Sequence, residues 1–313
     1  MLGTPRDAEL REIANDAAAF LLVGGQVPRV EKPSEIEFLR DYVAQNRPCI
    51  LTGLLDGPEW TPARQDWTQD GLVRMAGDRV VRVNATPTGH GDCVVDDVFV
   101  KPHEVQMTLE RMFELMADPE SGIVPYLSHQ NDNLRDPELD FLQRQVPSVL
   151  PLAKDTLGDL DAVNLWIGNE RAVSAMHQDY YENLYAVIQG EKVFHLLPPV
   201  IHPQVYLGQR KFPQAHYVQN DLTKAWTVER EPDAEEVAWI PRDPLDQLIE
   251  NPAFAPAFTE CRVQEGEVLY LPAMWLHRAT QSRLTVSVNY WHNMAFDHKW
   301  LGNNLVSVLT QDE

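Results

Sequence analysis

The sequence contains few cysteines and no long apolar run. Cys49, Cys93 and Cys261 are the three cysteines of a 313-residue chain, and they stand far apart with no CxxC pair. They therefore predict no disulfide framework and favour a reducing compartment. No apolar stretch approaches the ~18 residues that a membrane-spanning helix needs. We expect a cytoplasmic protein without a membrane partner.

Basic residues are also scarce. Lysine and arginine total 26 against 47 aspartates and glutamates, which gives a formal net charge of −21. Such a field repels phosphate backbones and argues against nucleic acid as a partner. It would attract a basic protein or peptide, although the same charge can serve solubility alone.

No internal repeat or low-complexity linker divides the chain, so we expect one domain over residues 1–313. Residues 1–120 look mixed, with helices prominent, and we expect them to wrap the core. Leu10, Ala14, Ala17 and Leu21 recur at helical spacing. The sequence SEIE at residues 34–37 matches a capping box that opens a second helix. Residues 121–293 should form the core, with a proline-rich insertion at 200–257.

From about residue 160 the sequence consists of short β-rich runs separated by glycine and proline. Six such runs with no long helical pattern between most of them predict an antiparallel barrel or sandwich. The final segment, residues 294–313, predicts a C-terminal helix. That helix could pack on the barrel or on a second subunit, so a homodimer is one possible assembly.

Two histidines and an aspartate form the main candidate site. His177 and Asp179 are separated by one residue, so on a strand their side chains share a face. His277 follows a hundred residues later, after another β-rich run. Two imidazoles with one carboxylate are the ligand set of non-haem iron(II) sites that keep coordination positions open. An HxD pair alone is common on protein surfaces, so the neighbouring residues decide its weight.

Lys192 lies in the apolar run KVFHLLP, and it is one of only seven lysines. Burying a lysine is costly unless an anion meets it. The alternative is an edge lysine that extends to solvent. Next to a metal site, we favour an inward lysine that pairs with the carboxylate of a small ligand.

Alternation also predicts which other side chains face the metal. On the strand after the HxD pair, Tyr181, Asn183 and Tyr185 share the face of the two ligands, although Tyr185 could equally be a core aromatic. On the last strand the polar set faces a cavity and the apolar set faces an outer layer under helices. The polar set comprises Ser287, Asn289 and Trp291, and the apolar set comprises Val286, Val288 and Tyr290.

Three segments resemble the JmjC family of 2-oxoglutarate-dependent oxygenases in order and spacing. They are AVNLWIGNERAVSAMHQDYYENLYAVIQGEKVFHLLPP, GEVLYLPAMWLHRATQS and VSVNYWHN, which begin at residues 162, 266 and 286. The resemblance implies a mainly β fold with flanking helices, built on a double-stranded β-helix (a cupin-like jelly roll).

The resemblance also implies roles for individual residues. His177, Asp179 and His277 would bind Fe(II). Lys192, Ser174 and Tyr126 would hold 2-oxoglutarate, which acts with O₂ as cosubstrate. Further residues would line the cosubstrate site, namely Asn183, Tyr185, Asn289 and Trp291.

The implied activity is hydroxylation of a lysine side chain in a protein substrate, and the resemblance points to a GTP-binding protein as that substrate. Asp92, in the predicted loop TPTGHGDCVVDD, and Tyr181 would meet the lysine ammonium. A loop aspartate is more often a solvated turn former. Two alternatives remain open, an N-methyl-lysine demethylase and a catalytically silent cupin-like binding protein. The silent kind typically lacks a metal ligand or the lysine.

Overall fold

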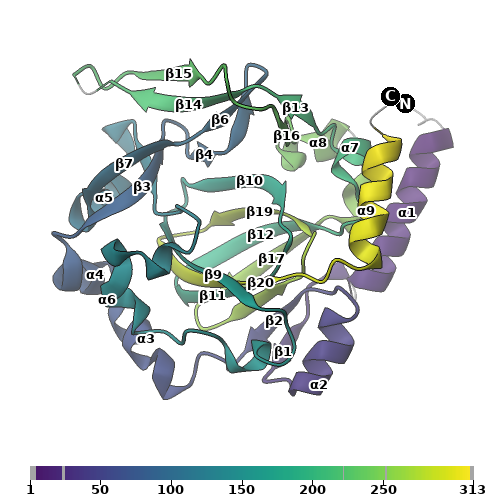
Figure 1. Cartoon of the computed structure of the whole chain (residues 1–313), viewed down its shortest axis with the longest axis horizontal. Helices are drawn as coiled ribbons and strands as arrows, with labels where there is room; N and C mark the ends of the chain where they lie inside the picture. Colours follow the sequence, from purple (N-terminus) through teal and green to yellow (C-terminus); the bar gives the residue numbers. More distant parts are fainter. Residues whose placement is uncertain (1–4, 23–24, 221, 251, 311–313) are drawn as a thin grey trace.

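A computed structural model describes residues 5–22, 25–220, 222–250 and 252–310. Two β-sheets form its centre (Figure 1), as the β-rich runs predicted. The six-stranded major sheet has the order β1 (Arg29–Glu31), β2 (Cys49–Thr52), β18 (Val268–Leu271), β11 (Tyr181–Gln189), β20 (Thr285–Asn293) and β9 (Leu160–Gly168). The five-stranded minor sheet has the order β17 (Thr259–Gln264), β12 (Glu191–Leu197), β19 (Leu276–Gln281), β10 (Val173–Gln178) and β4 (His90–Gly91).

The core lies in two layers. Side chains from the facing surfaces of the two sheets, such as Tyr185, Leu269 and Phe194, form one buried cluster. The outer surface of the major sheet forms a second cluster with the flanking helices. Val286, Val288 and Tyr290 belong to that outer cluster, which confirms the predicted division of the last strand into two faces. Its helices are α3 (Thr61–Asp66), α4 (Gln69–Ala76), α5 (Leu109–Ala117) and α6 (Asp140–Gln143).

The N-terminal residues fold against this core. Helix α1 (Pro5–Leu21) is present as predicted, and Ala14 and Ala17 are buried. The capping box also forms, because the Ser34 hydroxyl accepts the Glu37 N–H and the Glu37 carboxylate accepts the Ser34 N–H at 2.9 Å. Helix α2 (Glu35–Phe38) starts there and continues as a π-helix over Leu39–Val43. Strand β2 then joins the major sheet by pairing with β18.

Strands are more prominent in the first third than the sequence indicated. Two small sheets use β3 (Val80–Thr86), β7 (His103–Thr108) and β8 (Val124–Tyr126), and β5 (Cys93–Val95) with β6 (Val98–Lys101). The predicted loop at residues 86–97 contains β4 and β5, so that prediction is corrected. Because β4 pairs with β10 and β6 pairs with β14, these strands depend on distant partners that local sequence does not reveal.

The insertion at 200–257 has structure of its own. It contains α7 (Pro203–Tyr206), β13 (Arg210–Phe212), β14 (Gln214–Gln219), β15 (Trp226–Arg230), β16 (Val237–Trp239) and α8 (Pro244–Glu250). The β14–β15 hairpin extends along the top of the molecule in Figure 1. The insertion therefore builds one wall above the minor sheet.

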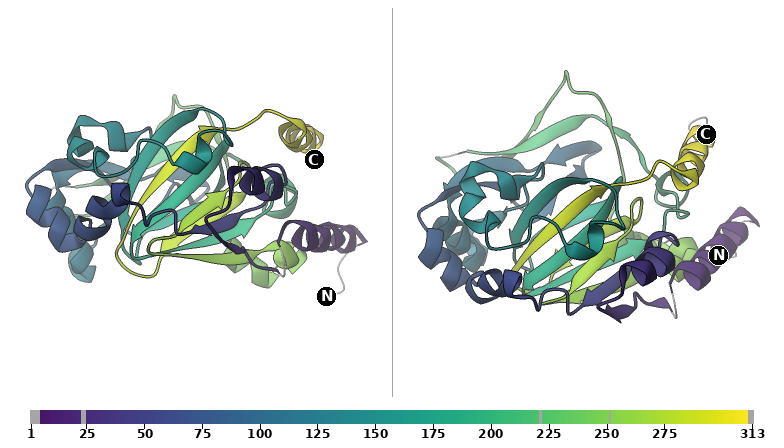
Figure 2. Two further views of the ribbon diagram at one scale, coloured as in Figure 1. Left: turned by 90° about the horizontal axis from the view of Figure 1, so that it is seen from below. Right: turned by 60° about the horizontal axis from the view of Figure 1, so that its bottom comes forward.

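The last segment contains helix α9 (His298–Leu309), which begins four residues after the predicted start at residue 294. Residues 311–313 of the predicted helix, and residues 1–4, lie outside the described part. Helix α9 lies at the same end of the molecule as α1 (Figure 2), and none of its residues is fully buried. No helix in the described ranges is both long and apolar enough to cross a membrane.

Candidate metal centre and adjoining cavities

Strand pairing brings the two histidines together. His177 on β10 is the direct partner of His277 on β19 in the antiparallel ladder, and their rings lie 4.2 Å apart. The Asp179 carboxylate comes within 3.7 Å of His177 Nε2 and 3.6 Å of His277 Nε2. One donor atom from each residue lies within 4.8 Å of the other two. The predicted triad is therefore assembled in a geometry that can hold one metal ion.

A bulge in β10 sets which residues face inward. The register shifts between Ser174 and His177, so two residues on β10, Ala175 and Met176, oppose one on β19, Arg278. In a regular strand, residues three apart point to opposite faces. The extra residue rotates the strand so that both Ser174 and His177 face the same cavity.

Backbone carbonyls fix the orientation of both imidazoles. His177 Nδ1 lies 2.7 Å from the Ala175 carbonyl oxygen, and His277 Nδ1 lies 3.0 Å from that of Trp275. A proton on each Nδ1 satisfies these carbonyls and leaves the Nε2 lone pair for a metal. Burial lowers the pKa of His277 to about 4, so this ring is neutral at pH 7. The donor set therefore fits a divalent metal of the iron class.

Lys192 points inward and is 1% exposed. Its ammonium donates to the Tyr126 hydroxyl at 2.7 Å and to Gln281 Oε1 at 2.8 Å, and both partners are neutral. Burial lowers the pKa of Lys192 to about 7. Ser174 lies beside the Tyr126 hydroxyl and lines the same cavity as Lys192. The predicted lysine, tyrosine and serine thus meet, and no carboxylate of the described residues pairs with Lys192.

The remaining predicted wall residues surround the same inner cavity. Asn289 donates to Asn183 Oδ1 at 3.2 Å and accepts from the Trp166 indole at 2.9 Å. The Tyr185 hydroxyl accepts from Ser287 at 2.9 Å. This cavity runs from the triad to Lys192 and is also lined by Trp291. Its polar walls suit a small polar ligand.

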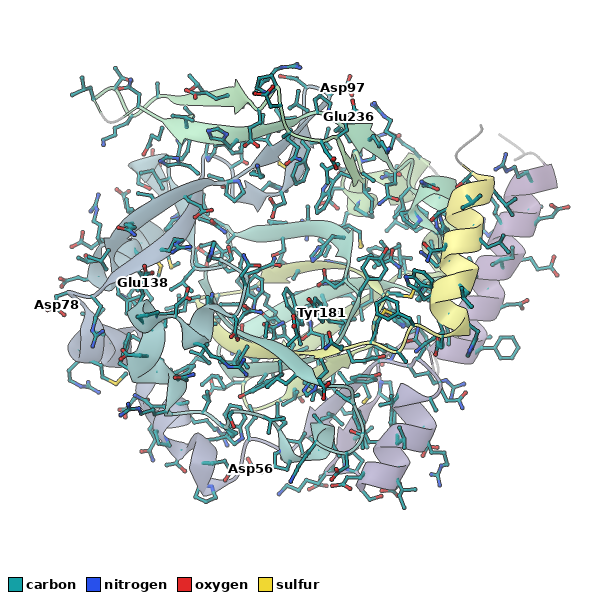
Figure 3. The ribbon with its side chains drawn as sticks, viewed as in Figure 1. Asp56, Asp78, Asp97, Glu138, Tyr181 and Glu236 are labelled. Atoms are coloured by element: carbon teal, nitrogen blue, oxygen red, sulfur yellow. The ribbon has the colours of Figure 1, made fainter. Side chains whose placement is uncertain are left out.

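The Tyr181 side chain lines neither this inner cavity nor a second, outer cavity that lies beside the triad. Its ring stacks on Trp291 at 4.9 Å, and its hydroxyl donates to Asp161 at 2.9 Å. Figure 3 labels it near the centre of the view, beside the strands of the major sheet. The hydroxyl is therefore occupied by an acid of the same chain, and its predicted contact with substrate would require that bond to break.

An outer cavity of about 380 Å³ opens next to the triad. Asp92 lines it from a backbone with φ of 50°, a left-handed conformation that aspartate tolerates. Burial raises the pKa of Asp92. Among the described residues no ion pair to Asp92 is found, whereas Lys101, which lines the same cavity, is paired with Glu231 at 2.7 Å. The Asp92 carboxylate thus lines the space beside the triad with no ion-pair partner among the described residues.

Gln281 and Trp239 are among the site residues that sequence reasoning missed. Gln281 holds Lys192 from β19, and the pairing of Lys192 with Gln281 across the β12–β19 ladder could not be read from the sequence. Trp239, in the insertion, lies with its ring parallel to His177 at 6.3 Å and lines the outer cavity. Trp239 lies in the segment WIPRD. An aromatic residue close to prolines was the local sequence feature that could have indicated its place in the site.

Comparisons with known proteins agree with this geometry. A family model described as a cupin-like domain matches residues 34–298. The chain belongs to the cupin-like JmjC family. It is 37% identical to the human bifunctional peptidase and (3S)-lysyl hydroxylase JMJD7, over 97% of this chain and 95% of that protein.

Two further relatives have different printed names. The chain is 33% identical to JmjC domain-containing protein E of Dictyostelium discoideum, over 91% of this chain and 88% of the relative. It is 34% identical to the lysine-specific demethylase JMJ32 of Arabidopsis thaliana, over 92% and 88%. JmjC proteins are 2-oxoglutarate-dependent oxygenases that use Fe(II), and the triad fits that metal.

The triad predicts a measurable metal affinity. We expect the purified chain to bind Mn²⁺ or Fe²⁺ at a ratio of one ion per chain. His177→Ala and Asp179→Ala should reduce this affinity by at least about tenfold, because each removes one of three ligands. Titration of the metal ion into each variant, followed by calorimetry, measures the loss of affinity.

The matched control is His216→Ala, since His216 pairs with Glu231 outside the triad. This variant should keep wild-type metal affinity. Equal affinity in all variants would show that the ion binds elsewhere.

Proposed function

We propose that this chain is a 2-oxoglutarate-dependent protein hydroxylase whose target is a lysine side chain. The observation that carries the proposal is the arrangement of one cavity with a metal triad at one end and an unpaired, buried Lys192 at the other. A dicarboxylic oxo acid has the two ends that such a cavity needs. The family resemblance supplies the identity of that acid.

Lys192 would hold the distal carboxylate of 2-oxoglutarate, with Tyr126 and Ser174 donating hydroxyl hydrogen bonds beside it. Side chains of Lys192, Phe194 and Leu196 share one face of β12. The partners of these residues on β19 are Gln281, Ala279 and His277. Lys192 and His277 are therefore four residues apart along the ladder, which is about 13 Å. Lysine and imidazole side chains project into that interval, and a five-carbon diacid would bridge the ammonium and the metal.

Iron, when bound, supplies the oxidising power that activates O₂ for attack on an unactivated C–H bond. His177, Asp179 and His277 would hold it and leave three positions open. Asn183, Asn289 and Trp291 would limit water beside the reacting atoms. The chain itself orients the cosubstrate through Lys192 and the substrate through the outer cavity.

Asp92 favours a cationic substrate. A lysine ammonium entering the outer cavity would meet the unpaired carboxylate and form a charge-assisted hydrogen bond. The overall charge of −21 would attract a basic protein to the same surface. This argument supports lysine independently of the name of the human relative. A GTP-binding protein as the substrate remains a prediction.

Demethylation of N-methyl-lysine is the second candidate, because a relative of similar identity carries the name of a lysine-specific demethylase. A catalytically silent binding protein is disfavoured because all three residues of the triad and Lys192 are present. Hydroxylation and demethylation share the metal chemistry and differ in the product.

The deciding experiment is to incubate the Fe²⁺-loaded chain with 2-oxoglutarate and a peptide digest of cell lysate. We expect lysine-containing peptides that gain one oxygen atom, together with succinate. His177→Ala is the control and should give neither product. Loss of a methylene group would identify a demethylase, cleavage of peptides without oxygen gain a peptidase, and no succinate with any peptide would disprove oxygenase activity.

Lys192 should make 2-oxoglutarate binding depend on pH. The bound carboxylate would raise the lowered pKa of Lys192, so binding takes up a proton once the free lysine has deprotonated. Affinity should be constant below pH 7 and fall about tenfold per pH unit above it. Calorimetry on the Mn²⁺-loaded chain, in buffers of different ionisation enthalpy, measures both affinity and proton uptake.

Lys192→Ala is the matched control. It should weaken binding by ~1.5–3 kcal/mol and remove the pH dependence. A wild-type profile as flat as that of the alanine variant would contradict the assigned role.

Asp92 should contribute to binding of the peptide substrate and not to binding of 2-oxoglutarate. We expect Asp92→Asn to reduce peptide hydroxylation by tenfold or more, because the neutral amide loses the charge-assisted bond, worth ~1.5–3 kcal/mol. Succinate release without peptide should remain. Asp97→Asn is the control, since Asp97 lies at the outer rim labelled in Figure 3 and pairs with Arg210. Equal hydroxylation by both variants would exclude Asp92 from recognition.

A further inference from the structure

The ladder between β10 and β19 fixes the positions of the two histidines of the triad and ends before the aspartate. The last pair of this ladder is Gln178 with Leu276. Asp179 follows Gln178 and lies in the short connection between β10 and β11, outside both strands. The backbone hydrogen bonds of the ladder therefore do not position Asp179, and another contact has to hold it beside the histidines.

A tight turn between β18 and β19 reaches Asp179. The turn spans residues 272–275 and is closed by the Trp275 N–H, which donates to the Pro272 carbonyl at 3.3 Å. Its third residue is Met274, whose N–H donates to the Asp179 carbonyl at 2.8 Å. In return, Gln178 Nε2 donates to the Met274 carbonyl at 2.7 Å. Both backbone groups of Met274 are thus bonded to the connection that carries Asp179.

Met274 has an unusual backbone conformation for its residue type. Its φ is 71°, at the position of the turn where a positive φ favours glycine. The other non-glycine residues with positive φ in the described ranges are aspartates, asparagines and lysines. Met274 is buried and packs against Ala273 and Met294. A left-handed conformation of this kind persists only when surrounding contacts impose it, and the bonds to Gln178 and Asp179 are such contacts.

The backbone at Asp179 also determines where its carboxylate points. Asp179 Oδ2 lies 3.7 Å from His177 Nε2 and 3.6 Å from His277 Nε2, so one oxygen faces both imidazoles. Among the described residues, no N–H or O–H donor other than these two rings is found at this carboxylate. Its placement therefore follows from the backbone that Met274 holds.

We propose that Gln178 is a positioning residue for the metal site and that it acts through Met274. The two hydrogen bonds, from Gln178 Nε2 to the Met274 carbonyl and from the Met274 N–H to the Asp179 carbonyl, form a clamp. This clamp holds Asp179 so that a single carboxylate oxygen completes the triad. The proposal rests on the triad as the metal site and is independent of the reaction assigned to the chain.

Gln178→Met tests the side-chain half of the clamp. Methionine keeps the length of glutamine and cannot donate to the Met274 carbonyl. We expect the affinity of the full chain for Mn²⁺, measured by calorimetry, to fall at least about tenfold, as is usual when a group that orients a metal ligand is removed. The visible absorption bands of the Co²⁺-loaded variant should also differ from those of the wild type, because these bands report the geometry of the ligands.

Gln189→Met is the matched control. Gln189 Nε2 also donates to a backbone carbonyl, that of Arg64 at 3.0 Å, and this residue lines neither cavity beside the triad. The control should lose thermal stability to an extent similar to Gln178→Met and keep the wild-type Mn²⁺ affinity and Co²⁺ spectrum. Equal losses of affinity in the two variants would overturn the proposal, since a general loss of stability would then explain both.

Met274→Gly and Met274→Val test the backbone half of the clamp. Both remove the buried methionine side chain, so both should unfold at a lower temperature, and circular dichroism verifies that each is folded. Glycine adopts a φ of this sign freely, whereas β-branched valine opposes it. We therefore expect Met274→Val to bind Mn²⁺ about tenfold more weakly than Met274→Gly.

Equal Mn²⁺ affinities in these two variants, or wild-type affinity in Gln178→Met, would overturn the proposal. The expected order of affinities in a chain that releases no succinate would support the clamp and disprove the oxygenase activity. Failure of the clamp and failure of the proposed function are thus distinguishable.

Discussion

The antiparallel pairing of β10 with β19 is the constraint on which the site depends. It places His177 directly opposite His277, so two ligands separated by a hundred residues share one rung of a ladder. The backbone hydrogen bonds of the ladder fix the distance between the strands. The bulge before His177 then turns Ser174 to the same side. The geometry of the candidate metal site is therefore a property of strand register.

The second constraint is the burial of Lys192, which has no anionic partner among the described residues. Lys192 is held by neutral hydroxyl and amide groups, and burial lowers its pKa. A charged group in such surroundings is costly unless a ligand of opposite sign enters. The folded chain thus carries an unfavourable interaction that a carboxylate would relieve, which is how a binding site differs from a structural ion pair.

Contacts from the major sheet and from segments outside both sheets hold the strands of the triad in place. The Trp275 indole, two residues before His277, donates to the Asn46 carbonyl at 2.9 Å and so ties β19 to the N-terminal segment. Buried Glu182 accepts from the Ala273 N–H at 3.1 Å and from the Tyr270 hydroxyl at 2.7 Å. The insertion contributes Trp239 beside His177. The wall elements therefore position the metal ligands as well as enclosing them.

The sequence by itself determined the candidate metal-binding residues and the local elements. The HxD pair and the distant His277 predicted the triad. A lysine in an apolar run predicted the inward orientation of Lys192, and alternation in the last strand predicted the polar face of β20. The capping box at Ser34 and helix α1 could also be predicted, since caps and helical periodicity depend on residues a few positions apart. Tertiary structure decided what depends on pairing between distant strands. The pairing of Lys192 with Gln281, the strands hidden at residues 90–108, the stacking of Trp239 and the hydroxyl partner of Tyr181 all come from contacts between segments far apart in the chain. These contacts cannot be predicted from neighbouring residues in the sequence, because the register between strands is set by the burial of whole sheet faces.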